Sequence, residues 1–524
     1  MFLYSGIALG LVLAVIFRQF KPHGGKEPPS LSGWMITNTY QYMTDMHGFL
    51  QRVASAQRRS NIIQFRLGPK KIYMVSGEKN IQAINTPSHS ISPEVFFLDV
   101  MANVWGAKPT ELVKFRQDKS GRRKNPIPGH ELPPGEPRLW HGQHHIYSEF
   151  LQRTDRANFL TTKYFDLFSD RLVQHPLNEW REVQLCEFFE SEMAEAALEA
   201  LMGPRLVELN PGFWPMMWEF ARIAPQLMWG LPRWMNPGPW KTQAEFQAMC
   251  RRYIDAAAKA FNPTGPEADA EWEPQYGSRM ARELVKWATE NLSPETTAGM
   301  VATFIFGTNA NSVPMSTWAL MHLVADPALY HAVRDECLAA STTDPVTGQR
   351  GFDPQKLFAM PLLQSVYIET LRLHVSINVT REVTQPITLD GFLLTPGSLI
   401  QAPSQIGQYN ERVWSAPGHP ASEFWGHRNL KRESEKPEFT MTGKTSSFFP
   451  FGGGPSICPG RVFAKQEILM TIAALVTRFE IELIDWIHPD GTKSDRPAQN
   501  DQSLIGAVGI PPDRDMRVRW KRLW

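Results

Sequence analysis

Residues 447–461 read SFFPFGGGPSICPGR, and the run VFAKQEILMTIAALVTRF follows directly at 462–479. Three consecutive glycines let the chain turn tightly and approach a flat ligand closely. The apolar spacing after them predicts a helix that begins just past Cys458. A thiol at a helix N-terminus is held as thiolate by the helix dipole and by free N–H groups. We therefore expect Cys458 to act as a ligand rather than as a core cysteine.

The residues around Cys458 indicate one metal-bound thiolate. Pro459 has no N–H, so Gly460 and Arg461 are the expected backbone donors to the sulfur. No CxxC pair and no zinc-ligand spacing occurs in the sequence. The other cysteines lie far away: Cys186, Cys250 and Cys337. Zinc takes four ligands, whereas a single thiolate suits the axial position of a haem.

The spacing Phe451-x-x-Gly454-x-x-x-Cys458-x-Gly460 resembles the haem-ligand signature of the cytochrome P-450 superfamily, and the resemblance covers residues 30–524. It implies that haem b is the cofactor and that Cys458 is its metal ligand. It also implies that Phe451, Gly454 and Gly460 surround the haem. The implied fold is mainly α with a minor β-sheet region, preceded by one N-terminal transmembrane helix.

Two further motifs follow the order of this family. Glu369 and Arg372 share one face of an amphipathic helix; such a pair is usually solvated, but the resemblance implies a buried pair that Arg428 completes. Arg381 begins the next strand, where the family places an arginine that binds a haem propionate. A guanidinium suits a carboxylate. The alternative for Arg381 is an ordinary arginine on a surface strand.

The haem-binding positions also depart from the family pattern. The segment Trp140-His-Gly-Gln-His144 lies where the family commonly has Trp and Arg four residues apart, so His144 replaces the arginine. Ser456 lies where a basic residue is usual. The resemblance implies haem contacts from Trp140 and His144, with two of the ordinary propionate contacts weakened or altered.

The longest predicted helix, 296–325, lacks the family's acid–alcohol pair. Ala310 and Asn311 occupy those two positions. Asparagine can donate and accept hydrogen bonds but cannot titrate. Proton delivery to dioxygen must then use water, use Thr308 or Ser312, or be dispensable. Asn311 is our candidate catalytic residue beside Cys458; the alternative is an amide satisfied within its helix.

Pro314 lies in the same helix and lacks an N–H, so we expect a kink and a free carbonyl at Ala310. The pattern Ala-Asn-x-x-Pro, followed by Trp318, resembles the sterol 7α-hydroxylase and prostacyclin synthase branch of the family. The segment 507–519 resembles the last strands of that branch. The branch contains monooxygenases and also isomerases that rearrange a peroxide without external electrons.

Residues 2–17 carry no charge, and Arg18 and Lys21 follow them. As a helix they would span about 24 Å, slightly less than a bilayer core of about 30 Å. Because the positive charge follows the apolar run, we expect a signal anchor rather than a cleaved signal peptide. The predicted organisation is an anchor at 1–20, a proline-containing linker at 21–45 and a catalytic domain at 46–524. A buried N-terminal helix is the alternative.

The composition excludes several classes of protein. Hydrophobic residues make up 42% and charged residues 20%, with a net charge of +1, so neither a disordered chain nor a dedicated nucleic-acid binder fits. The segment 214–240 holds five of the 17 tryptophans, interleaved with methionines, and is either a membrane-facing lid over an apolar pocket or ordinary core. The basic, proline-rich segment 114–137 is expected to be a solvated surface loop.

These observations predict a membrane-anchored haem-thiolate monooxygenase. It would activate dioxygen and oxidise a lipophilic natural product such as a terpenoid, sterol or polyketide, as in fungal secondary metabolism. No GxGxxG motif in a strand–helix context is present, so NADPH electrons would come from a separate reductase. The expected location is the endoplasmic reticulum membrane, single-pass, with the catalytic domain cytosolic. The alternatives are a haem-thiolate isomerase or dehydratase acting on a peroxide, and a haem-binding protein without catalysis.

Overall fold

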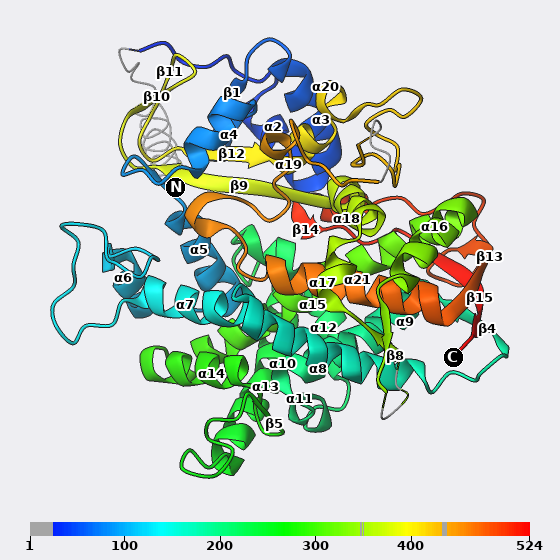
Figure 1. Cartoon of the computed structure of the whole chain (residues 1–524). Helices are drawn as coiled ribbons and strands as arrows, with labels where there is room; N and C mark the ends of the chain where they lie inside the picture. Colours follow the sequence, from blue (N-terminus) through cyan, green and yellow to red (C-terminus); the bar gives the residue numbers. More distant parts are fainter. Residues whose placement is uncertain (1–24, 346–347, 349, 432–436) are drawn as a thin grey trace.

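The computed structural model describes residues 25–345, 348, 350–431 and 437–524. A large helical body lies beside a smaller region of sheet, which is at the top of Figure 1 together with the N-terminal helices. The prediction of a mainly α fold with a minor β-sheet region is confirmed.

The largest sheet has the order β1-β2-β12-β9-β14, and β3 pairs with β9 off this path. Its strands are β1 (Ile62–Leu67), β2 (Lys70–Val75), β3 (Ile91–Ser92), β9 (Val375–Val383), β12 (Leu399–Pro403) and β14 (Ala507–Gly509). β1 and β2 are antiparallel with Ile62 opposite Val75, and they turn at Gly68, whose φ is 52°. Arg381 lies in β9 opposite Ile400 of β12. The sequence predicted that Arg381 begins its strand, but β9 begins at Val375, so Arg381 lies near the end of this strand.

The remaining sheets are small. β13 (Phe479–Ile487), β15 (Asp515–Arg522) and β4 (Trp180–Gln184) form a three-stranded antiparallel sheet in that order. Three two-stranded hairpins complete the set: β5 (Trp272–Glu273) with β6 (Gly277–Ser278), β7 (Ser341–Thr343) with β8 (Arg350–Phe352), and β10 (Ile387–Leu389) with β11 (Phe392–Leu394).

The helices fall into two groups: those that carry residues of the candidate site or pack beside it, and the rest. Those that carry or border the site are α4 (Glu78–Asn85), α5 (Glu94–Val100), η1 (Met101–Trp105), α6 (Pro109–Gln117), α7 (Leu139–Leu151), α12 (Phe213–Met228), α15 (Pro294–Ala325), α18 (Pro361–His374) and α21 (Arg461–Arg478). The others include α2 (Met35–Thr44), α3 (Met46–Gln57), α8 (Thr154–Leu172), α9 (Leu185–Phe188), η2 (Phe189–Met193), α10 (Ala194–Met202), α11 (Arg205–Glu208), α13 (Pro237–Ala260), α14 (Arg279–Asn291), α16 (Pro327–Leu338), α17 (Pro354–Ala359), α19 (Ser404–Gln408) and α20 (Glu411–Trp414).

Helix α15 is the central element of the body. Ser293 caps its first turn by accepting a hydrogen bond from the Thr296 N–H, and Pro294 occupies the first helical position, where an N–H is not needed. The helix is apolar all round because α13, α18 and α21 pack against it. The expected helices 296–325 and 462–479 are confirmed within two residues at their ends.

Part of the predicted linker at 21–45 is helical. Residues 35–44 of the expected linker form helix α2, and the Leu31 N–H donates to the Gln64 carbonyl on β1, so this segment packs on the sheet. The predicted anchor 1–20 lies outside the described residues. Across the described ranges, no helix is both long and apolar enough to cross a membrane.

The Trp- and Met-rich segment 214–240 divides between the two alternatives. Met217 lies in the core, and Trp214 and Trp218 pack against it from α12. In contrast, Trp229 and Trp234 after this helix are 42% and 82% exposed. The segment is therefore core on one side and exposed apolar surface at its loop.

Candidate functional site

The loop before α21 is built from close backbone approaches. The Cys458 N–H donates to the Phe451 carbonyl at 2.9 Å, which folds the loop back on itself. Gly454 has a φ of 63°, and a Cβ there would lie 2.2 Å from the Asn85 carbonyl oxygen at the end of α4. Only glycine fits this approach. Phe451 is partly buried against the main core, which ties the loop to the body of the molecule.

The Cys458 sulfur lies where the sequence predicts it. Cys458 is solvent-accessible, and α21 begins at Arg461. Desolvation raises the pKa of the Cys458 thiol, while the N–H groups of Gly460 and Arg461 and the Arg461 charge act to lower it. The two backbone donors are those that the sequence indicated. They would support a thiolate bound to a positively charged metal.

Gly460 leaves room beside the sulfur. A Cβ added at Gly460 would lie 3.7 Å from the Cys458 Sγ, in ordinary contact with it. The position of Gly460 one residue before α21 also brings its N–H to the sulfur.

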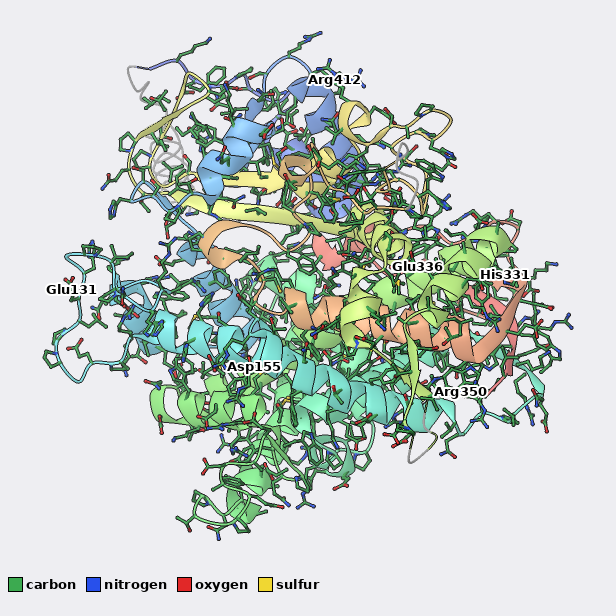
Figure 2. The ribbon with its side chains drawn as sticks, viewed as in Figure 1. Glu131, Asp155, His331, Glu336, Arg350 and Arg412 are labelled. Carbon is green, nitrogen blue, oxygen red and sulfur yellow. The ribbon has the colours of Figure 1, made fainter. Side chains whose placement is uncertain are left out.

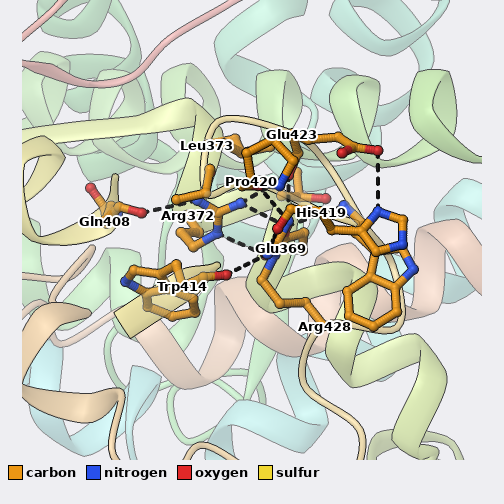
Figure 3. Close-up of polar contacts among 12 residues, drawn as sticks. Glu369, Arg372, Leu373, Gln408, Trp414, His419, Pro420, Glu423 and Arg428 are labelled. Carbon is orange, nitrogen blue, oxygen red and sulfur yellow. Dashed lines mark hydrogen bonds and ion pairs between the residues drawn. The ribbon is translucent and has the colours of Figure 1, made fainter. Parts of the chain in front are cut away.

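The Glu369, Arg372 and Arg428 side chains form a buried ionic cluster, as the resemblance implied (Figure 3). The Arg372 Nε and Nη2 donate to the two Glu369 carboxylate oxygens at 2.8 and 2.7 Å. The Arg428 Nε donates to Glu369 Oε1 at 2.6 Å. Buried charges are tolerated only when they are paired and hydrogen-bonded, and this cluster meets that condition.

The remaining donors of the cluster bind main-chain carbonyls. Arg372 Nη1 donates to the Gln408 carbonyl at 2.9 Å, and Arg428 Nη2 donates to the Glu423 carbonyl at 2.7 Å. The cluster therefore joins α18 to the meandering segment 408–428 that leads into the Cys458 loop. Its role is structural.

Arg381 is buried and points at the Cys458 loop. Its Nη2 donates to the Gly453 carbonyl at 2.9 Å and to Asn85 Oδ1 at 3.0 Å, and its Nε donates to the Ile84 carbonyl at 3.3 Å. Desolvation lowers its pKa to about 10, so it is charged at neutral pH. Arg381 is not a solvated strand arginine, and its role as a propionate ligand stays a prediction.

Trp140 and His144 lie on α7. The Trp140 Nε1 donates to the Phe115 carbonyl at 2.9 Å, so this indole N–H is bound to the main chain and any cofactor contact falls to the ring. The His144 Nδ1 lies 3.2 Å from the Ser148 hydroxyl. Desolvation, with the nearby charge of Arg122, lowers the pKa of His144 to about 4. His144 is therefore neutral at physiological pH and cannot supply the charge of the arginine that it replaces.

Arg122, which lies beside Trp140, is not a solvated loop residue as the sequence predicted. The Arg122 guanidinium carbon lies 4.6 Å from the centre of the Trp140 ring, and its Nε and Nη2 are buried. The Ser456 hydroxyl is also buried, and no hydrogen-bond partner for it is found among the described residues. No sequence signal separates Arg122 from the other basic residues of its loop.

Asn311 is fixed by two hydrogen bonds within the protein. Its Nδ2 donates to the Gly307 carbonyl at 3.0 Å, and its Oδ1 accepts from the Gly509 N–H of β14 at 3.0 Å. Helix α15 continues through Pro314, which leaves the Ala310 carbonyl without its helical donor. A Cβ at Gly509 would lie 3.3 Å from that carbonyl oxygen. Asn311 thus connects α15 to β14. Its catalytic role and the kink at Pro314 stay predictions.

The two alternative hydroxyls on α15 are also bound to the helix. The Thr308 hydroxyl donates to the Ile305 carbonyl at 3.0 Å, and the Ser312 hydroxyl donates to the Thr308 carbonyl at 2.8 Å. Beside Ser312 lies Glu467 of α21, which the sequence analysis did not select. Desolvation raises the pKa of Glu467 to about 8, so it is largely protonated at neutral pH.

A family model described as "Cytochrome P450" matches residues 207–499. The chain belongs to the cytochrome P450 family. It is 76% identical over 519 residues, 99% of this chain and 97% of the relative, to the protein described as cytochrome P450 monooxygenase calL of Penicillium decumbens. This cytochrome P450 is therefore a monooxygenase.

More distant relatives and a solved structure are also similar to this chain. The human 7-alpha-hydroxycholest-4-en-3-one 12-alpha-hydroxylase is 28% identical over 235 residues, 41% of this chain and 43% of that protein. A solved structure titled "Retinoic acid bound cyanobacterial CYP120A1" superposes on this P450 with a TM-score of 0.65 and a sequence identity of 17%. The superposition covers 96% of this P450 and 100% of that chain. This likeness shows the fold.

The residues of this P450 fit a haem. Cys458 is an exposed residue whose sulfur has two N–H donors, which suits an iron ligand, and Gly454 lets the loop approach the end of α4 closely. Arg381 supplies one cation for a carboxylate, and Arg122 supplies a second, since its Nε and Nη2 have no hydrogen-bond partner among the described residues. On α15, a Cβ at Gly307 would meet no atom within 4 Å, so there is open space beside the helix.

Proposed function

We propose that this P450 oxidises a lipophilic natural product, of the size of a terpenoid, sterol or polyketide, with NADPH electrons from a separate reductase. The observation that carries the proposal is the Cys458 sulfur, held at the start of α21 by the Gly460 and Arg461 N–H groups. Haem bound there supplies the activation of dioxygen and the transfer of one oxygen atom to a C–H bond. The 76% identity to a fungal monooxygenase supports the same reading.

The residues of α15 would shape the site rather than titrate. Asn311 has no ionisable group, and the Thr308 and Ser312 hydroxyls donate to helical carbonyls. We infer that protons arrive through water in the open space beside Gly307. The strand β14, held by Asn311, would form part of the wall that positions the substrate.

The test is product formation by the full-length protein with NADPH and a purified NADPH-dependent reductase. A panel of terpenoids, sterols and polyketides is added, and mass spectrometry looks for products that gain one oxygen atom. A lipophilic substrate should also shift the Soret band on binding. If no member of the panel shifts the band or is oxidised, the proposed substrate class is wrong.

A second candidate is an isomerase or dehydratase acting on a peroxide. It is favoured by Ala310, which stands at the position before Asn311 where the family commonly has an acid, because a peroxide rearrangement needs no proton delivery to dioxygen. It predicts turnover of a lipid peroxide without NADPH or reductase, to a product of unchanged mass or less one water. Strict dependence on NADPH would exclude it.

We also propose that the chain is anchored in the endoplasmic reticulum membrane by residues 1–20, single-pass, with the catalytic domain cytosolic. Support comes from the uncharged run at 2–17 and from apolar side chains on and before α2: Trp34 is 80%, Ile36 73% and Tyr40 70% exposed. Such side chains suit a membrane interface. Deleting residues 1–24 should move most of the protein to the soluble fraction and keep its haem spectrum. Loss of haem on truncation would support a structural helix instead.

A further inference from the structure

The loop between α6 and α7 has a rigid base and a projecting end. Figure 2 shows Glu131 at the outer end, away from the body of the molecule. At the base, the Arg138 guanidinium donates to four main-chain carbonyls, those of Ser120, Gly121, Arg123 and Lys124. A planar guanidinium with several fixed acceptors holds the main chain in one conformation. Residue 122 is therefore presented in a defined direction.

Two further contacts fix the same turn. The Asp118 carboxylate accepts the Ser120 N–H at 3.0 Å and the Trp140 N–H at 3.2 Å, which joins the loop to the start of α7. The Arg122 carbonyl accepts a hydrogen bond from the His141 Nδ1 at 3.0 Å. The Arg122 main chain thus lies against α7, one turn from His144.

The Arg122 side chain points inward and is held by aromatic rings. Its guanidinium carbon lies 4.1 Å from the centre of the Phe97 ring and 4.6 Å from that of Trp140. These cation–π contacts orient the group but use none of its N–H donors. The Nε and Nη2 atoms are buried, and within the described part of the chain neither has a hydrogen-bond partner. A buried unpaired donor costs about 1–3 kcal/mol, more when charged, so it points to a ligand.

The charges around Arg122 favour a negatively charged ligand. Desolvation lowers the Arg122 pKa to about 10, Glu94 raises it and the charge of Arg381 lowers it further. Glu94 lies near, but its carboxylate accepts the Ser92 hydroxyl at 3.1 Å and forms no ion pair with Arg122 among the described residues. Arg122 and Arg381 are thus two like charges close enough to repel. An anion bound to the Arg122 guanidinium would offset this repulsion.

We propose that Arg122 binds a haem propionate and supplies the positive charge that His144 does not. The proposal rests on the haem-thiolate site described above and adds to it a residue outside the Cys458 signature. Its basis is a guanidinium held between Phe97 and Trp140, whose buried Nε and Nη2 have no hydrogen-bond partner in the described part of the chain. The charge of Arg381 acts on the same group. Trp140 then acts through its ring, which orients Arg122, rather than through its N–H.

The test measures haem retention in the purified holoenzyme. Arg122→Gln removes the charge and Arg122→Lys keeps it; the matched control is Arg123→Gln, because Arg123 is the exposed neighbour in the same loop. The readout is the rate of haem transfer to excess apomyoglobin. Losing a charge-assisted hydrogen bond should accelerate haem loss about 10-fold or more in Arg122→Gln, less in Arg122→Lys, and not in Arg123→Gln.

A rescue variant keeps the test decisive if Arg122→Gln folds poorly. Arg122→Gln combined with His144→Arg returns a cation to α7 and should slow haem loss toward the wild-type rate. Reconstitution with haem dimethyl ester, which lacks free carboxylates, should abolish the difference between wild type and Arg122→Gln. Equal rates for wild type and Arg122→Gln with natural haem would overturn the proposal. That outcome would leave the Cys458 assignment intact, because the band of the reduced carbon monoxide complex reports it separately.

Discussion

At the scale of single residues, the Cys458 environment makes a spectroscopic prediction. The sulfur receives the N–H groups of Gly460 and Arg461, which stabilise negative charge on it. Cys458→Ser replaces the thiolate with a weakly donating hydroxyl, so the red-shifted Soret band of the reduced carbon monoxide complex should disappear. Activity with NADPH should disappear with it. The measurement is a difference spectrum of the purified protein.

The other cysteines provide the controls for this prediction. Burial raises the pKa of Cys250 and of Cys337, and burial together with Asp515 raises that of Cys186, so all three are protonated. Changing each to serine should leave the red-shifted band in place. Retention of the band in Cys458→Ser, or its loss in one of these controls, would show that the ligand is misassigned.

Asn311 allows a second prediction at this scale. In Asn311→Ala the Gly509 N–H loses its acceptor, and the hold of α15 on β14 weakens by about 1–2 kcal/mol. We expect weaker substrate binding in spectral titrations, and more NADPH consumed per product, as the wall loosens. Gly509→Ala should act similarly, because its Cβ would lie 3.1 Å from the Asn311 Cα. Unchanged affinity and coupling in both variants would mean that the contact is only structural.

The sequence predicted some of these residues and could not predict others. The Cys458 ligand and its Gly460 and Arg461 donors follow from local spacing, so they were predictable. Asn311 and Gly509 are 198 positions apart, and no local pattern connects them. Arg122 looked like one of several basic residues in a proline-rich loop, since its inward direction depends on the contacts of Arg138. Contacts that need the folded chain are the ones that sequence reasoning missed.

At the scale of elements, the buried cluster joins α18 to the segment 408–428. Glu369→Gln leaves Arg372 and Arg428 buried without a counter-charge, and breaking such a cluster costs about 3–5 kcal/mol. We expect a large fall in the thermal midpoint and in haem incorporation. An exposed pair provides the matched control. Lys431→Met breaks the Lys431–Glu438 contact of 2.7 Å, which should cost about 0–1 kcal/mol.

The outcome separates two roles for this cluster. If Glu369→Gln and Lys431→Met lower the midpoint equally, the buried cluster contributes nothing beyond an exposed pair. The expected inequality follows from burial, because the Glu369 and Arg372 side chains are both 0% exposed whereas those of Lys431 and Glu438 are 49% and 58% exposed. The helices themselves were predictable from apolar periodicity. The sheet order β2-β12-β9-β14 was not, because it joins strands that are distant in sequence.

At the scale of the whole molecule, buried histidines couple stability to pH. His322 and His374 lie between α15 and α18 with their Nε2 atoms 2.8 Å apart, and the His374 ring stacks 3.9 Å from that of Trp318. Desolvation lowers the pKa of His374 to about 3 and that of His322 well below its usual value. His144 is lowered to about 4. All three are neutral in the folded protein.

One buried carboxyl acts in the opposite direction. Desolvation raises the pKa of Glu467 from 4.5 to about 8 in the fold. Between these values the folded protein binds a proton that the unfolded chain releases, so this group makes stability fall as pH rises from 4.5 to 8. In a plot of stability against pH, the histidines lower stability on the acid side, and Glu467 lowers it on the alkaline side.

We therefore expect stability to pass through a maximum as pH rises, with the fall on the acid side caused by the histidines and part of the fall on the alkaline side caused by Glu467. Below pH 6.5 the unfolded chain protonates its histidines and the folded protein does not, so stability should fall by up to about 1.4 kcal/mol per pH unit for each histidine. The measurement is the thermal midpoint of unfolding between pH 4.5 and 8.5, monitored by the loss of the Soret band. His144→Gln should flatten the acid side, and Glu467→Gln should raise the midpoint at pH 8 with little effect at pH 5. A Glu467→Gln midpoint that changes equally at both values would show that the carboxyl is not protonated in the folded protein.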